Sequence, residues 1–157
     1  METIRPLKRE DLDDLASLCF PELPIEELRE RVEEELAAQA RGEGVTLVAE
    51  EGGRVGVTAR LVPSGEVGWL FNISSHPDFR GRGILQRLLG RMEEIARERG
   101  LTRLAIHVRE DNSRACRAYE KAGFKRVGAE GMHGTQLRYE KKLTGGAGCP
   151  QSADIVG

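Results

Sequence analysis

The feature that most constrains this chain is the stretch His76–Leu85, which joins two segments of different character. The apolar segment Trp69–Ile73 precedes it and a pattern of helical period follows, so the sequence predicts a strand, a turn and the start of a helix. Within the turn, Arg80–Gly83 combines two glycines with two arginines. Glycine lets the backbone approach a bulky anion, and the unpaired amides at a helix start attract negative charge. We expect a phosphate-bearing cofactor to bind at this turn.

Two common phosphate motifs do not fit the turn. A Walker loop needs Gly-Lys-Ser/Thr at a fixed spacing, and no such sequence follows. The dinucleotide fingerprint is half present, because Gly81 and Gly83 occur but Gln86 stands where the third glycine is required. The acidic residue that should follow at a strand end is also missing, since the glutamates in that region fall inside the helix pattern. An NAD(P)-binding domain is therefore disfavoured.

A family resemblance fits better. Arg80–Leu85 resembles the pyrophosphate signature Arg/Gln-x-x-Gly-x-Gly/Ala of the GNAT acyltransferase superfamily, with Leu85 in place of the last small residue. A second stretch, Asn112–Phe124, closely resembles the other hallmark of that family, Asn-x-x-Ala-x-x-x-Tyr-x-Lys-x-Gly-Phe. Both motifs occur in family order, and the resemblance is specific from Val67 to Val127.

The fold class that we expect is α/β (α+β), a single GNAT-like domain over residues 1–143 with about four helices. The resemblance implies a mixed seven-stranded sheet that splays at its centre. Periodicity and turn signals predict the strands Glu2–Pro6, Val45–Glu50, Arg54–Val62, Glu66–Ser75, Thr102–Val108, Phe124–Val127 and Gln136–Leu143. Helices are expected after Asp11, which we interpret as an N-cap, and after Pro24, Gly83 and Asn112. Residues 144–157 are rich in glycine without periodicity and predict a flexible tail.

Composition narrows the class of partner. The formal net charge of −2 provides no field for nucleic acid or an anionic membrane surface. The start of the chain lacks the pattern of a signal peptide and no long apolar run occurs, which predicts a cytoplasmic protein that does not enter a membrane. Cys19, Cys116 and Cys149 lack metal-ligand spacing, so we expect free thiols and no metal.

The resemblance implies acetyl-CoA as the acyl donor, lying where the splayed strands separate. Its pantetheine arm would pair with the backbone of Ile73, Ser74 and Ser75, as an added strand does. Its pyrophosphate would sit beside Arg80 on the backbone amides of Gly81, Arg82, Gly83, Ile84, Leu85 and Gln86. Leu85 can supply its amide if its side chain points into the core. Asn112 contacts the pantetheine arm, caps its helix, or does both.

The implied reaction is direct attack of a neutral amine on the thioester, with Tyr119 as the acid for the CoA thiolate. The sequence does not identify the base, because no carboxylate lies between Glu66 and Asp78. The candidates are Glu66, His76, His107 and His133; a water chain or an amine that arrives neutral would also suffice, and we expect the rate to follow the neutral amine. Strand alternation puts His107 on the face opposite Leu104, Ile106 and Val108. Cys116 is interpreted as a small core residue and not as a nucleophile.

A different class of function stays open at this point. The chain could be a non-catalytic module that binds or senses acyl-CoA, since no base is evident. The acceptor, an amine-bearing small molecule or a peptide, would be selected by the segments Phe20–Gly44 and Glu130–Gln136, which resemble the family least. Whether the chain forms a homodimer is also open.

Overall fold

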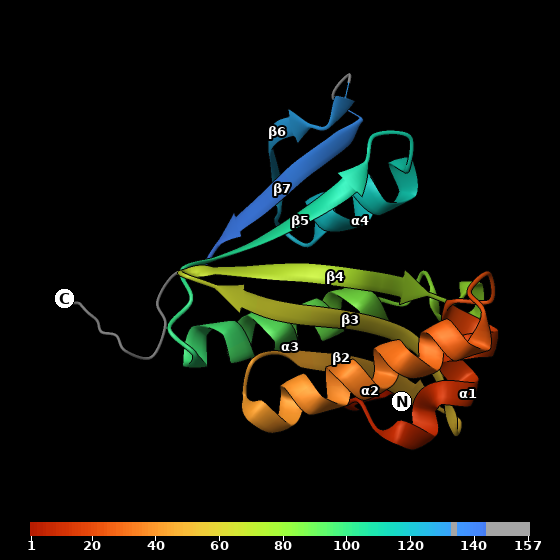
Figure 1. Ribbon diagram of the computed structural model, residues 1–157. Coiled ribbons are helices and arrows are strands. Elements are labelled where there is room, and N and C mark those ends of the chain that lie inside the picture. The colour runs from red at the N-terminus through yellow and green to blue at the C-terminus, as the bar shows by residue number, and fades with distance from the viewer. Residues whose placement is uncertain (133–134, 144–157) are drawn as a thin grey trace. The chain divides into compact units, whose positions relative to one another are not determined.

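Seven strands pair in the order β1-β2-β3-β4-β5-β7-β6 in the computed structural model, which describes residues 1–132 and 135–143 (Figure 1). The β4–β5 pair is parallel, whereas the β1–β2, β2–β3, β5–β7 and β6–β7 pairs are antiparallel, so the sheet is mixed. Together with four helices, this confirms the predicted fold class. The splay of the sheet stays a prediction, and the predicted tail 144–157 lies outside the described residues.

The strands and helices follow one another in the predicted order, with bounds close to the predicted ones. The strands are β1 (Thr3–Pro6), β2 (Val45–Glu51), β3 (Arg54–Ser64), β4 (Val67–Ser75), β5 (Arg103–Arg109), β6 (Lys125–Glu130) and β7 (Gln136–Lys142). The helices are α1 (Leu12–Asp14), α2 (Ile25–Arg41), α3 (Ile84–Glu98) and α4 (Ser113–Lys121). Contacts group the chain into two compact units, Met1–Val62 with Phe71–Arg91, and Pro63–Leu70 with Met92–Gly157.

The first unit is built on the β1–β2–β3 sheet, against which α2 packs (Figure 1). Because α2 carries apolar residues at helical spacing, it buries Leu28 and Val32 against Val48 and Val55 of the sheet. The helix ends at Gly42, whose φ of 73° is a left-handed C-cap. This packing holds the sheet that carries the phosphate turn.

The segment after β1 differs from the single helix that was predicted. It is a 3₁₀ turn (Arg9–Asp11), the short α1 and a π-helical turn (Leu15–Cys19) in succession. The prediction that Asp11 caps this helix with its side chain was wrong. Its carboxylate instead accepts hydrogen bonds from the Lys8 amide at 2.8 Å and from the Arg5 guanidinium at 2.9 and 2.8 Å. These bonds to the half-buried Arg5 and to the Lys8 amide occupy the carboxylate oxygens of Asp11 that a cap would use.

Turn residues account for two other boundaries. Gly52 and Gly53 have φ values of 62° and 80°, as a two-residue hairpin requires, and the predicted hairpin between β2 and β3 is confirmed. Pro63 was expected in the next turn, but β3 continues through Ser64 and the chain reverses at Gly65, whose φ is 61°. Proline fits an extended strand end, so the turn begins later than predicted.

In the second unit β5 lies between β4 and β7. Leu104, Ile106 and Val108 are buried on one face of β5, and His107 is exposed on the other, as alternation predicts. Strand β6 begins at Lys125, one residue later than expected, and runs on to Glu130. Phe124 precedes the strand because it is buried against Tyr119 of α4, with ring centroids 6.2 Å apart.

Candidate functional site

The predicted phosphate turn presents a row of backbone amides. Gly81 and Gly83 have φ values of 78° and 76°, and no atom outside its neighbours lies within 4 Å of where a Cβ on Gly81 would be. The Arg87 amide donates to the Gly83 carbonyl at 3.0 Å, which begins the α3 ladder. The amides of Ile84, Leu85 and Gln86 precede that bond and therefore have no partner within the helix. They form, with the positive end of the helix dipole, a seat for an anion.

The turn is fixed to β3 by the side chain of Phe79. The ring is buried, and a Cβ on Gly56 of β3 would lie 2.3 Å from it, so only glycine fits opposite this ring. The His76 amide donates to the Gly56 carbonyl at 2.8 Å. A single 3₁₀ turn, Pro77–Phe79, follows, in which the His76 Nδ1 accepts the Asp78 amide at 3.1 Å. The helix start is thus held at a defined place on the sheet.

The arginines of the turn have partners within the chain. Arg82 donates to Glu51 at 3.0 Å and to the Asp78 carbonyl at 3.0 Å, and Arg87 forms a two-bond pair with Glu2. These bonds hold the pKa of both carboxyls below their usual range and raise the pKa of both guanidinium groups. The carboxylates of Glu51 and Glu2 therefore offset much of the positive charge of Arg82 and Arg87. The attraction of the turn for an anion then rests largely on the backbone amides.

Leu85 is half-buried, whereas Ile84 and Leu88 beside it are buried completely. Its side chain therefore lies at the margin of the apolar face of α3 rather than within the core, as had been expected. A helical residue offers its backbone amide whatever its side chain, so a leucine at this position leaves the amide seat unchanged.

The end of β4 supplies backbone and serine groups next to the turn. Ile73, Ser74 and Ser75 are half-buried. The Ser74 hydroxyl donates to the Cys19 carbonyl at 2.7 Å. Arg80 donates from Nε and Nη2 to the Ser75 carbonyl at 3.0 and 2.6 Å, so this carbonyl is already a hydrogen-bond acceptor within the chain.

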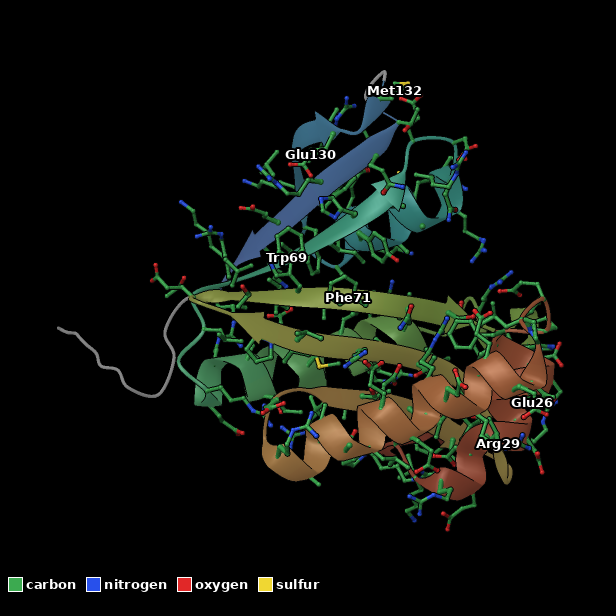
Figure 2. All side chains as sticks on the ribbon, in the orientation of Figure 1. Glu26, Arg29, Trp69, Phe71, Glu130 and Met132 are labelled. Atoms are coloured by element: carbon green, nitrogen blue, oxygen red, sulfur yellow. The ribbon has the colours of Figure 1, made fainter. Side chains whose placement is uncertain are left out.

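Just before this segment the strand is irregular. Asn72 has a φ of 55°, the left-handed region, and the neighbouring Phe71 side chain is exposed (Figure 2). This irregularity was not predicted. An asparagine inside an otherwise apolar strand was the available signal, because asparagine tolerates this conformation better than other residues with a Cβ.

The second motif lies in the second unit, on α4. The Asn112 side chain accepts the Ala115 amide at 3.1 Å, which confirms the predicted N-cap. Tyr119 is 6% exposed, and burial raises the pKa of its phenol to about 12. The charge of Cys116 acts in the same direction and that of Arg114 opposes it. A phenol with this pKa keeps its proton at neutral pH and can donate it.

Cys116 is half-buried, so it is less buried than we expected for a residue of the core. It lies beside Tyr139 of β7, whose hydroxyl donates to Glu120 at 2.9 Å. Burial and these two neighbours raise the pKa of the Tyr139 phenol above its ordinary range. No histidine is recorded as a partner of the thiol in the described part of the chain, and nothing there activates it as a nucleophile.

The four candidate bases differ in their surroundings. The His76 Nδ1 accepts the Asp78 amide and so holds the 3₁₀ turn. Glu66 is exposed at the turn before β4. His133 lies outside the described residues. His107 donates through Nε2 to Glu130, whose other oxygen accepts from Arg138 at 2.7 Å.

Trp69 completes the surroundings of His107. The two rings stack with centroids 5.0 Å apart and an angle of 29° between their planes. The proximity of Trp69, Glu130 and Arg138 to His107 was not predicted from the sequence. Alternation along β5 predicted that His107 points away from the buried face. The neighbours of His107 depend on the position of β5 between β4 and β7, and sequence periodicity does not reveal strand order.

A small cavity lies in the first unit, at the segment expected to select the acceptor. Its wall includes Phe20, Arg31, Glu35, Arg60 and Asn72. The Arg31 guanidinium lies 4.9 Å from the centre of the Phe20 ring, and its Nη1 is buried without a hydrogen-bond partner among the described residues. Glu35 accepts from the Thr46 hydroxyl at 2.6 Å. A polar group of a ligand or a water would complete the hydrogen bonding of Arg31.

Comparison with known proteins identifies a family and a fold. The model of the acetyltransferase (GNAT) family matches residues 9–124. The PaiA N-acetyltransferase from Thermoplasma acidophilum, solved in complex with coenzyme A, is 21% identical, with a TM-score of 0.74 over 90% of this chain and 99% of that chain. A ribosomal-protein-alanine N-acetyltransferase from Brucella melitensis is 22% identical, with a TM-score of 0.73 over 90% and 99% of the two chains. A spermidine N-acetyltransferase chimera from Vibrio cholerae and hSSAT is 20% identical, with a TM-score of 0.72 over 91% and 96%.

None of the helices within residues 1–132 and 135–143 is both long and apolar enough to cross a membrane.

Proposed function

This chain belongs to the acetyltransferase (GNAT) family, whose model matches residues 9–124, and we propose that it transfers an acetyl group from acetyl-CoA to a primary amine of a small molecule or a peptide. The observation that carries the proposal is the amide seat at the start of α3, held between Gly81 and Arg87. It is the kind of site that binds a pyrophosphate, and a structure of the same fold was solved with coenzyme A.

The residues present fit the donor. Gly81 leaves open space above the backbone, and the amides of Ile84, Leu85 and Gln86 supply hydrogen bonds for phosphate oxygens. Arg80, which now donates to Ser75, would turn toward the phosphates or stay on that carbonyl. The backbone of Ile73–Ser75 would bind the pantetheine arm, and Asn112 would contact the arm while it caps α4.

Acetyl-CoA supplies an activated thioester, and the protein supplies position and proton transfer. We assign Tyr119 as the acid, because a phenol with a pKa of about 12 stays protonated throughout the physiological range. A backbone amide of β4 would stabilise the charge on the carbonyl oxygen. No metal is needed for this scheme, and the acceptor is an amine-bearing molecule rather than nucleic acid.

Thiol release from acetyl-CoA tests the proposal directly. The panel of acceptors comprises spermidine, a peptide with an N-terminal alanine and 2-phenylethylamine, which represent a polyamine, a protein terminus and an aromatic amine. We expect at least one of them to raise thiol release well above the rate without an amine, with the acetylated amine found by mass spectrometry.

Two results would contradict the proposal in different ways. Acetyl-CoA binding without thiol release for any of these amines would favour the non-catalytic acyl-CoA-binding module. Absence of acetyl-CoA binding by the folded protein would exclude both functions.

A further inference from the structure

One histidine of the second unit is held by three neighbours from three other strands. His107 on β5 stacks on Trp69 of β4, donates to Glu130 of β6, and faces Arg138 of β7 in the strand register (Figure 2 labels Trp69 and Glu130). Folding alone does not require these contacts, because water can satisfy the ring nitrogens of an exposed histidine.

The contact with Glu130 fixes the tautomer of the ring. A carboxylate only accepts hydrogen bonds, so the Nε2 that contacts it must carry the proton. In the neutral imidazole the lone pair is then on Nδ1. The side chain is 38% exposed, and the contact with Glu130 leaves the Nδ1 lone pair free of any hydrogen bond to the described residues.

Glu130 is itself held in place. Its Oε1 faces His107 and its Oε2 accepts from Arg138 at 2.7 Å, while Arg138 lies 3.5 Å from Glu140. Arg109, on the same face of β5, is paired with Asp111 at 3.1 Å. The charged side chains around the ring are thus arranged in pairs, and Glu130 is the carboxylate that contacts the ring.

We propose that His107 is the general base of the transferase, accepting a proton at Nδ1 from the ammonium group of the acceptor, and that Glu130 is the residue that positions it. This inference rests on the proposed function, names the base that the sequence left open, and replaces the expectation that the rate follows the neutral amine alone. Trp69 holds the plane of the ring, so that Nδ1 keeps one direction.

The proton balance is closed. His107 takes one proton from the ammonium, and the neutral amine then forms the C–N bond to the thioester carbon as the C–S bond breaks. The leaving thiolate takes the phenolic proton of Tyr119, and the amide nitrogen returns its surplus proton to that phenolate through water. The imidazolium of His107 releases its proton to solvent, so that one proton is produced for each acetyl group transferred.

The test measures kcat/KM against pH for His107→Gln, with the acceptor of the panel that reacts best. At pH 7 we expect a loss on the order of 10²–10⁴-fold, the usual effect of removing a general base. The deficit should shrink as the pH approaches the pKa of the acceptor's own ammonium group, about 10 for an alkylamine and about 8 for a peptide N-terminus, because the amine then arrives neutral. A structural role would lower the rate equally at every pH. Melting temperature and acetyl-CoA affinity should match the wild type.

Variants at Glu130 separate its role in positioning the His107 ring from the effect of its negative charge. Glu130→Gln keeps an oxygen that accepts from Nε2–H and should lose less activity than Glu130→Ala, which frees the ring. Glu110→Gln, which removes an exposed carboxylate just after β5, is the matched control and should stay within about twofold of the wild type, as surface changes away from a site do.

The outcomes distinguish this inference from the proposed function. If the wild type is active but His107→Gln keeps at least a third of its kcat/KM at pH 7, or shows a deficit that does not change with pH, the inference is wrong and the function stands. If the wild type releases no thiol with any amine, both are wrong.

Discussion

At the scale of the residue, Tyr119 illustrates how a fold adapts an ordinary side chain. An exposed phenol has a pKa of about 10, and burial on α4 raises that of Tyr119 to about 12. The shift keeps the proton on the oxygen while an acceptor amine is being deprotonated. An acid and a neutral amine can therefore coexist over a wide range of pH, which direct attack on a thioester requires.

Replacement of Tyr119 by Phe should lower kcat on the order of 10²–10⁴-fold and leave acetyl-CoA affinity about unchanged, since only the acid is lost. Because the raised pKa keeps the phenol neutral up to about pH 12, the wild-type kcat/KM should not decline between pH 8 and about 10.5. Steady-state kinetics across this range checks both points. An unchanged kcat in the variant, with acyl transfer shown to be rate-limiting, would remove Tyr119 from the mechanism.

Gly83 tests the amide seat. Its φ of 76° strains any residue with a Cβ, and that Cβ would lie 3.0 Å from the movable end of Arg87. Gly83→Asp should abolish acetyl-CoA binding, because the carboxylate repels the pyrophosphate at the place where the backbone must come close. Gly53→Asp is a matched control with a φ of 80° and open space around it.

Both glycine variants should lose about 1 kcal/mol of unfolding free energy from the left-handed backbone. Only the change at Gly83 should alter affinity, measured by calorimetric titration with acetyl-CoA. Near-normal binding by folded Gly83→Asp would mean that the pyrophosphate sits elsewhere.

At the scale of the element, sequence periodicity predicted most of the strands and helices, because each buries one face and turns carry their own residue types, whereas the mixed sheet was implied by the family resemblance. Errors arose where the backbone departs from a regular period. The π-helical turn Leu15–Cys19 and the left-handed Asn72 are examples, since neither changes the pattern of apolar residues. The phosphate turn was predictable because its glycines are required by geometry. The partners of His107 were not, because cross-strand contacts depend on strand order.

Asn112 belongs to this scale because it begins α4. Its side chain caps the helix, so Asn112→Ala should cost about 1 kcal/mol of unfolding free energy, whereas Asn112→Ser should retain most of the stability. The serine variant then isolates the second role. If Asn112 also contacts the pantetheine arm, the serine variant should bind acetyl-CoA more weakly although its helix is capped. Equal affinity would leave Asn112 as a cap alone. Denaturant unfolding and titration measure the two effects separately.

At the scale of the whole molecule, the net charge of −2 and the paired arginines of the turn argue against binding driven by a strong positive field. Recognition of the donor should rest instead on defined hydrogen bonds to the backbone. Such binding selects the shape of the ligand, and it should discriminate acetyl-CoA from other nucleotides that carry a pyrophosphate.

Thermal unfolding with ligands tests this selectivity on the intact chain. A ligand that binds only the folded state at 100 times its Kd adds about 2.7 kcal/mol of stability, which corresponds to a rise in Tm of about 5–11 °C for a protein of this size. We expect such a rise with acetyl-CoA and with CoA, because both carry the pyrophosphate and the pantetheine arm. NAD should give no comparable rise, since the turn lacks the third glycine and the acidic ribose partner of a dinucleotide site. A larger shift with NAD than with acetyl-CoA would contradict the assignment of the donor, whereas a shift with acetyl-CoA that disappears in Gly83→Asp and persists in Gly53→Asp would trace that stability to the amide seat.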